Sequence, residues 1–192
     1  MSRTELSATA ALEVREGAVT ASAAELEALT AQLAAQEPTT FMAYGRECTM
    51  RRKMLFFGEG GYRFSGQTCA AAAAMDPVVQ RCLAAAQEWL PGANAALVNL
   101  YKDGNEYISA HRDNEAQHAA GSPILTFSFG AVRTFRIRKW EAGKSHPTLH
   151  DAPLPSHSVA VMHGMQQHFT HEIPVQRRVT YSRLSVTVRQ FA

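Results

Sequence analysis

The chain has 192 residues, of which 46% are hydrophobic and 19% charged, and its formal net charge is +2. These values are typical of one globular domain with a sizeable core. No apolar run approaches the ~18 residues that a bilayer span requires, and the N-terminus lacks the basic-then-apolar pattern of a signal peptide. We therefore expect a nuclear or cytoplasmic protein with no membrane partner.

Charge and cysteine content narrow the classes further. The small net charge does not by itself indicate nucleic acid, so any basic surface must come from local clusters, such as those at 51–53, 133–139 and 177–178. The cysteines, Cys48, Cys69 and Cys82, are odd in number and form no C-x-x-C pair. They predict reduced thiols rather than a disulfide framework or a zinc site.

Residues 1–21 are small and polar with little periodicity, and we expect them to form a loose N-terminal lead-in. Ser22 and Glu25 form a capping box that opens a helix to about Gln36, with leucines on one face. We interpret this segment as a packing helix that carries no chemistry.

The next segment, residues 40–57, suits strands or a hairpin, and Tyr44 and Gly45 would lie at its tip. A second helix is predicted to begin at Asp76-Pro77, because Asp suits the N-cap and Pro the first turn. It is expected to stop before the Pro-Gly pair at 91–92.

After residue 92 the polarity alternates with period two, which is typical of β-strands. The predicted strands are 95–101, 106–111, 123–129, 132–138, 157–163, 168–173 and 181–190. Short strands after an opening helical half predict an α+β fold with a β-sandwich or barrel core. Residues 141–156, rich in proline, are expected to form a loop without regular structure.

The functional interpretation depends on His111-Arg112-Asp113. Residues i and i+2 of an extended chain point to the same face, so His111 and Asp113 can present an imidazole and a carboxylate to one point. One more histidine from a distant strand would complete a facial triad, which binds Fe(II) and leaves positions open for substrates. The motif alone is weak, because it arises by chance in many proteins. His171, near the far end of the chain, strengthens it.

The final predicted strand places Arg183, Ser185, Thr187 and Arg189 on one face. An amphipathic surface strand would show the same alternation. Beside an Fe(II) site, however, two arginines that bracket two hydroxyls suit a small diacid, because the guanidinium fork matches a carboxylate. A diacid next to an open iron site indicates 2-oxoglutarate as cosubstrate.

These elements resemble the AlkB family of Fe(II)- and 2-oxoglutarate-dependent nucleic-acid dealkylases. The matching stretches are Asn99-Leu-Tyr101 with Asp103-Gly104, His111-Arg-Asp113 with Glu115, 123–130, Met162-His-Gly164 with Gln167, His171-Glu-Ile-Pro174, and the closing R-x-S-x-T-x-R at 183–189. With Arg52-Lys53 and Tyr62-Arg-Phe-Ser-Gly66, the resemblance runs from about residue 41 to the end. It looks closest to the small animal-type members.

The resemblance implies one dioxygenase domain over 1–192, with a double-stranded β-helix (jelly-roll) core and a substrate-recognition lid over 40–66. It implies Fe(II) bound by His111, Asp113 and His171. His163 and His168 precede His171 and are expected to be structural or exposed, and His168 is the first substitute if the register is wrong.

The family match also assigns the cosubstrate contacts. Arg183 would pair with the distal carboxylate of 2-oxoglutarate, and Arg189 would lie near its keto acid end. Asn99 and Tyr101 would hydrogen-bond the cosubstrate. The sequence departs at Ser185, where the family usually has asparagine, and the shorter side chain puts one contact in doubt.

Substrate contacts follow from the same match. Phe64 would stack on a flipped base, with Tyr62 and Ser65 as polar contacts, and Glu115 would face the edge of the base. Tyr44 would act as a wedge in the space that the base leaves. A core aromatic at 64 and an exposed tyrosine at a turn are the plain alternatives.

Arg52 and Lys53 suit contacts with phosphate, although a solvated basic run is equally consistent with the sequence. The implied reaction is oxidative demethylation of 1-methyladenine- or 3-methylcytosine-type lesions in DNA or RNA, in the context of DNA repair. It consumes Fe(II)-activated O2 and 2-oxoglutarate and yields succinate, CO2 and formaldehyde. The alternatives are an oxygenase of RNA or protein, or a non-catalytic nucleic-acid-binding jelly roll. A monomer is expected.

Overall fold

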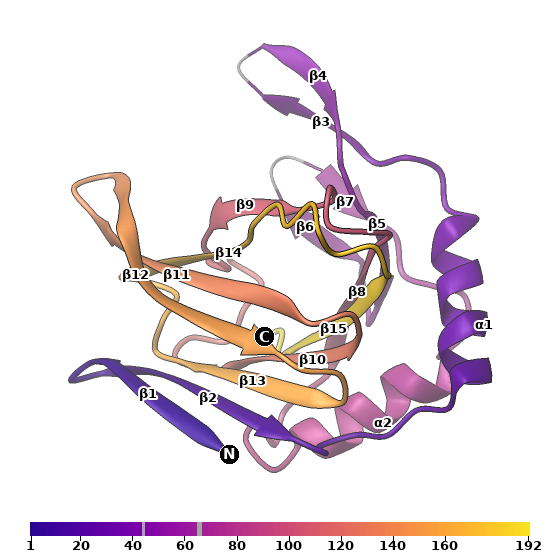
Figure 1. Cartoon of the computed structure of the whole chain (residues 1–192). Helices are drawn as coiled ribbons and strands as arrows, with labels where there is room; N and C mark the ends of the chain where they lie inside the picture. The colour runs from indigo at the N-terminus through magenta and orange to yellow at the C-terminus, as the bar shows by residue number, and fades with distance from the viewer. Residues whose placement is uncertain (44, 65–66) are drawn as a thin grey trace.

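The computed structural model describes residues 1–43, 45–64 and 67–192, with positions 42, 43, 64 and 67 described by their backbone alone. Two β-sheets pack face to face (Figure 1). The large sheet contains β1 (Ser2–Ser7), β2 (Ala10–Glu16), β5 (Lys53–Phe57), β8 (Ala95–Tyr101), β10 (Ile124–Gly130), β13 (Ser158–His163) and β15 (Arg183–Arg189). The small sheet contains β9 (Ile108–His111), β11 (Arg133–Glu141), β12 (Lys144–Leu154) and β14 (Phe169–Ile173).

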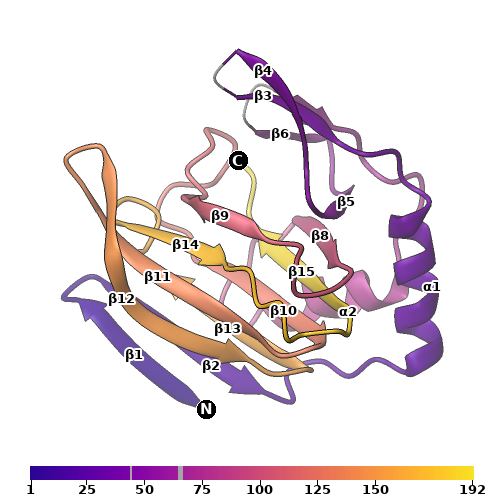
Figure 2. The same ribbon diagram turned by 45° about the horizontal axis from the view of Figure 1, so that its top comes forward.

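The strand order is β1-β2-β13-β10-β15-β8-β5 in the large sheet and β12-β11-β14-β9 in the small sheet. Neighbouring strands are antiparallel throughout both sheets. Two short hairpins, β3 (Thr40–Ala43) with β4 (Arg46–Thr49) and β6 (Tyr62–Phe64) with β7 (Gln67–Cys69), complete the strands. Figure 2 shows the β3–β4 hairpin standing away from the sandwich, at the end where β9 lies.

The predicted helices are present as α1 (Ala23–Ala34) and α2 (Pro77–Ala86). Ser22 and Glu25 form the capping box of α1, and Asp76 caps α2 by accepting from the backbone N–H groups of Val78 and Val79. Among the described residues, no helix combines the length and apolarity needed to cross a membrane.

The central strands of the large sheet are buried on both faces, which explains why β8 and β15 are buried along their entire length. One face is covered by the two helices through the apolar residues Leu29, Leu33, Val78, Val79 and Cys82. The opposite face packs on the small sheet through Ile124, Phe135, Ile137, Phe169 and Ile173, among others. The polar side chains of β15 therefore project into the space between the two sheets.

The predicted loose lead-in over residues 1–21 is wrong. Residues 2–16 form the β1–β2 hairpin, and β2 pairs with β13 through partners such as Leu12 and Met162. Leu12 is fully buried and contacts the core between the sheets. The sequence signal for β2 was the alternation of apolar and charged residues from Leu12 to Arg15. It is easy to overlook because it spans only a few residues.

The loop expected over 141–156 is also wrong, because most of it forms β12. This strand lies at the edge of the small sheet, so its outer side needs no backbone donors. Pro147 and Pro153 are tolerated there for that reason, and the pairing with β11 shifts register near Arg138. The expected lid range, 40–66, likewise includes a core strand, since β5 pairs with β8.

Candidate active site

A cluster of His111, Asp113 and His171 lies between the sheets. β9 and β14 are neighbours, and their register pairs His111 directly with His171. Asp113 follows two residues after His111, and Asp113 Oδ1 lies 3.6 Å from His111 Nε2 while Asp113 Oδ2 lies 3.8 Å from His171 Nε2. One ligand atom from each residue falls within 4.8 Å of the others. The structure thus brings together the three residues predicted as metal ligands.

Both histidines are held in the neutral form that metal binding requires. His111 Nδ1 donates to the Ser109 carbonyl at 2.8 Å, which leaves the lone pair of Nε2 free for a metal. Burial lowers the pKa of His111, and burial together with the adjacent His111 lowers the pKa of His171 to about 3.

The carboxylate is held in its ionised form. Burial alone would raise the pKa of Asp113, but the positive charge of Arg189 outweighs burial and holds this pKa well below its usual value. Arg189 Nη2 donates to Asp113 Oδ2 at 3.1 Å. Two neutral imidazoles and one carboxylate are the donor set that suits Fe(II), so the residues fit the metal that the resemblance implies.

His168 and His163 do not join this cluster. His168 is exposed, and its carbonyl accepts from the backbone of Trp140. His163 Nε2 lies 3.8 Å from Glu13 Oε2 on the N-terminal hairpin. The geometry therefore favours His171 over both alternatives.

A cavity of about 660 Å³ opens beside the three ligands. Arg183, Ser185, Thr187 and Arg189 all line it, as the alternation of β15 predicted. Asn99 and Tyr101, from the neighbouring strand β8, line the same cavity. The structure thus gathers the predicted cosubstrate residues on one wall.

Arg183 is the feature that best fits a diacid in this cavity. The residue is 1% exposed, and its Nη2 donates to Ser128 Oγ at 2.9 Å. Nε and Nη1 have no hydrogen-bond partner within the described part of the chain. Burial lowers the pKa of Arg183 to about 10, so the side chain still carries its charge at neutral pH. A buried guanidinium with open donors is costly unless an anion binds it, and the distal carboxylate of 2-oxoglutarate would satisfy it.

Ser128 was missed from the sequence. It lies on β10 opposite Ser185, and Thr126 lies opposite Thr187, with 3.3 Å between the two threonine hydroxyls. The alternation Thr-Phe-Ser-Phe at 126–129 carried the signal for a polar cavity face. It could not reveal which strand would lie beside β15.

Arg52 reaches into the cavity instead of the outer surface. Its Nε donates to Asn99 Oδ1 at 2.7 Å, which leaves the amide N–H groups of Asn99 available to a ligand. Lys53 donates to the carbonyl of Gln36, just after the end of α1. This geometry does not support phosphate contacts for either side chain, and those contacts remain predictions.

The expected base pocket adjoins the metal cluster. Tyr62 is buried, and its hydroxyl donates to Glu115 Oε1 at 2.8 Å. Its ring stacks on Phe56 and Phe191, with centroid separations of 5.8 and 6.0 Å. Phe64 belongs to β6, which pairs with β7, and its side chain lies outside the described residues. Tyr44 and Ser65 also lie outside them.

Gln117 links the metal-binding loop to β6 and was not predicted. Its Nε2 donates to the Gly61 carbonyl at 3.2 Å, and its Oε1 accepts from the Arg63 N–H at 2.8 Å. These contacts fix the backbone on both sides of Tyr62. No sequence signal could have found them, because they join residues more than fifty positions apart along the chain.

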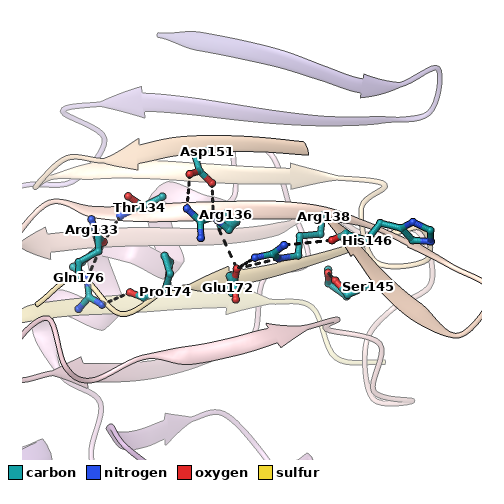
Figure 3. Close-up of polar contacts among 11 residues, drawn as sticks. Arg133, Thr134, Arg136, Arg138, Ser145, His146, Asp151, Glu172, Pro174 and Gln176 are labelled. Atoms are coloured by element: carbon teal, nitrogen blue, oxygen red, sulfur yellow. Dashed lines mark hydrogen bonds and ion pairs between the residues drawn. The ribbon is translucent and has the colours of Figure 1, made fainter. Parts of the chain in front are cut away.

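The arginines of β11 are structural. Arg133 is buried and donates to the Gln176 side chain and to the carbonyl oxygens of Asp103, Glu106 and Pro174. Figure 3 shows Arg136 paired with Asp151, and Arg138 paired with Glu172. Two members of the basic cluster noted at 133–139, Arg136 and Arg138, are therefore paired with carboxylates.

Comparison with known proteins agrees with this geometry. The sequence profile of the 2OG-Fe(II) oxygenase superfamily matches residues 15–189. The chain belongs to this superfamily, which confirms Fe(II) and 2-oxoglutarate as the expected metal and cosubstrate, with O2 as the oxidant.

Within the superfamily the chain resembles AlkB proteins. It is 33% identical over 159 residues to the human DNA oxidative demethylase ALKBH2, across 77% of this chain and 59% of that protein. It is 28% identical over 102 residues to the mouse alpha-ketoglutarate-dependent dioxygenase alkB homolog 3, across 50% of this chain and 36% of that protein. The chain thus spans less than two thirds of these relatives. The predicted AlkB resemblance is confirmed.

A solved structure, that of OsALKBH1, superposes with a TM-score of 0.58 at 16% identity. The match covers 93% of this chain and 97% of that one. At this identity the likeness concerns the fold alone. Together with the two packed antiparallel sheets, it confirms the jelly-roll core.

Proposed function

We propose that this protein removes methyl groups oxidatively from alkylated bases in DNA, of the 1-methyladenine and 3-methylcytosine type. The observation that carries the proposal is one cavity that holds both the His111, Asp113, His171 cluster and the open donors of Arg183. The name of the human relative supports DNA as the substrate.

The reaction balances with one O2 and one 2-oxoglutarate for each methyl group. Fe(II), when bound, supplies the oxidising chemistry, in which one oxygen atom enters succinate as CO2 leaves and the other hydroxylates the methyl group. The resulting hydroxymethyl group leaves the ring nitrogen as formaldehyde, and the base regains its normal form.

The residues of the chain divide the remaining work. Arg183 anchors the distal carboxylate, while Asn99, whose amide oxygen is taken by Arg52, offers N–H donors to the cosubstrate. Arg189 holds Asp113 in place as a ligand. Glu115 places a negative charge beside the base pocket, where an alkylated base carries a positive charge.

The test is a panel of methylated oligonucleotides, as single- and double-stranded DNA and RNA, incubated with Fe(II), 2-oxoglutarate and O2. Mass spectrometry follows removal of the methyl group, and succinate is measured in parallel. We expect demethylation of DNA by the wild type and none by His171→Ala. Succinate formation without reaction of any oligonucleotide would overturn the substrate and leave an oxygenase of another class. Location in the nucleus or cytoplasm stays a prediction.

A further inference from the structure

Some arginines of this protein have a carboxylate partner and others do not. Away from the cavity, five form ion pairs with carboxylates on the N-terminal hairpin, on α1, just after α2 and on the small sheet: Arg3, Arg15, Arg81, Arg136 and Arg138. In the cavity, Arg189 pairs with Asp113. Arg51 and Arg112 also line the cavity, and within the described residues neither has a carboxylate within 4 Å. Positive charge is therefore left unpaired at these two positions beside the cavity.

Of these two arginines, Arg112 has the better defined position. It lines the cavity and lies between the metal ligands His111 and Asp113 in sequence. Its guanidinium carbon lies 4.6 Å from the centre of the Trp140 ring, and its Nη1 donates to the Gln167 carbonyl at 3.4 Å. Stacking fixes one face of the guanidinium and leaves donors along its edge available.

Arg138, on β11 near Trp140, differs from Arg112 in its partner. Arg138 lies two residues before Trp140, and its guanidinium pairs with Glu172 at 2.8 Å (Figure 3). Arg112 lies over the Trp140 ring, but within the described residues no carboxylate pairs with it. A half-buried guanidinium held flat beside a cavity and lacking a counterion is suited to an anionic ligand.

We propose that Arg112, held on Trp140, binds a backbone phosphate of the nucleic acid next to the target nucleotide. This inference rests on the proposed function for the class of polymer. When a base enters the cavity, the phosphates that flank it must remain at the cavity mouth. The planar fork of arginine binds a phosphate bidentately, and its stacked position reduces the entropic cost of binding.

The first measurement is binding of a fluorescent single-stranded oligonucleotide with one methylated base, by anisotropy, with Mn(II) in place of Fe(II) so that no turnover occurs. The slope of log affinity against log salt becomes shallower by about 0.7 for each phosphate of a single strand that the protein no longer neutralises. We expect this change for Arg112→Gln and none for the matched control, Arg136→Gln. Arg112→Lys should keep the slope but bind more weakly, because it keeps the charge but not the stacked fork.

The second measurement locates the phosphate. Methylphosphonate, which is uncharged, replaces each phosphate flanking the methylated base in turn. We expect one replacement to weaken the wild type but not Arg112→Gln. Trp140→Leu should weaken binding, and the double variant should bind no worse than Arg112→Gln alone. Equal effects of every methylphosphonate on both proteins, or a wild-type slope for Arg112→Gln, would overturn the proposal.

The outcomes also separate this inference from the proposed function. If binding depends on Arg112 but no oligonucleotide is demethylated, the proposed demethylation is wrong and the phosphate contact of Arg112 is supported. If the wild type demethylates an oligonucleotide but Arg112→Gln keeps the wild-type salt dependence of binding, only the phosphate contact of Arg112 is wrong. If no oligonucleotide binds, both ideas fail. Melting temperatures of all variants, measured with and without Mn(II), establish that each is folded.

Discussion

The strand that carries the proposed cosubstrate residues and the strand that supplies the first predicted metal ligand differ in their support. β15 pairs with β8 from Arg183 to Arg189 and with β10 on its other side, and its apolar face packs on the helices. β9 is an edge strand that pairs with β14 at His111 and Ile108, with a register shift between them. The wall proposed to bind the cosubstrate is therefore built into the core, whereas His111, the first predicted metal ligand, lies on an edge strand.

This difference predicts different sensitivities in the two regions. Substitutions on the cosubstrate wall act on ligand affinity, because the wall itself is rigid. At the β9 edge, a bound metal also contributes to the stability of the structure, because it joins His111 on this edge strand to Asp113 and to His171 on β14. The two short hairpins are a third case: β3 and β4 pair with each other in a separate sheet, whereas Tyr62 of β6 packs against Phe56 of β5.

The largest effect should follow from removal of a metal ligand. His171→Ala or Asp113→Ala should abolish succinate formation, and each should also remove most of the thermal stabilisation by Mn(II). Binding at a hundredfold excess over Kd stabilises a folded protein by about 2.7 kcal/mol. The check is calorimetry with and without Mn(II). If Mn(II) stabilises His171→Ala as much as it stabilises His168→Ala, His171 is not the third metal ligand. The contrast between the metal site and the β15 wall would then be wrong.

The next largest effect concerns the polar face of β15. Arg183→Ala should raise the apparent KM for 2-oxoglutarate by at least ~10-fold, since a charge-assisted bidentate contact contributes more than roughly 1.5 kcal/mol. Titration calorimetry of 2-oxoglutarate with the Mn(II) protein gives the same quantity without turnover. Arg189→Ala should act mainly on kcat, because this side chain orients Asp113. An unchanged KM for Arg183→Ala would place the anchor on another residue.

A smaller effect is expected at the base pocket. Phe64→Ala should weaken binding of a methylated oligonucleotide by about 1–3 kcal/mol, the range for base–aromatic stacking. Glu115→Ala should reduce demethylation, and both variants should keep the slow consumption of 2-oxoglutarate that occurs without oligonucleotide. Tyr44→Ala should affect duplex substrates more than single strands. Full demethylation by both Phe64→Ala and Glu115→Ala in single-turnover assays would contradict the assigned pocket.

The smallest effect should come from Gln117, which we expect to act through Tyr62. Removing its two hydrogen bonds to the backbone should weaken substrate binding by about 1 kcal/mol. In a double-mutant cycle, Gln117→Ala and Tyr62→Phe should be non-additive. Hydrogen exchange should show the Arg63 amide less protected in Gln117→Ala. Gln80→Ala, an exposed position on α2, is the matched control. Additive effects with unchanged Arg63 protection would make Gln117 irrelevant to the pocket.

The sequence predicted which residues face the cavity better than it predicted which residues contact one another. Alternation on β15 predicted the polar face of Arg183 and Arg189, and the spacing of His111 and Asp113 predicted two ligands on one side of a strand. The partner of Arg183, Ser128, depends on the order of strands in the sheet, which local patterns do not encode. Gln117 likewise acts through contacts that only the folded chain creates.

The errors in the fold have a common physical origin. Proline in β12 suggested a loop, but an edge strand tolerates missing backbone donors. The β1–β2 hairpin looked irregular because only its second strand is well buried. In both cases the location of the strand at the edge of a sheet, rather than its composition, decided the outcome.

The same hairpin has a consequence for solubility. A free sheet edge offers unpaired N–H and C=O groups to other chains, and charged residues and bulges on the edge discourage such pairing. β1 provides both, with Arg3 and Glu5 exposed and a register shift after Glu5. Without it, β2, with its buried Leu12, would become the outermost strand. β1 therefore gives this edge of the large sheet the features that discourage pairing with other copies of the protein.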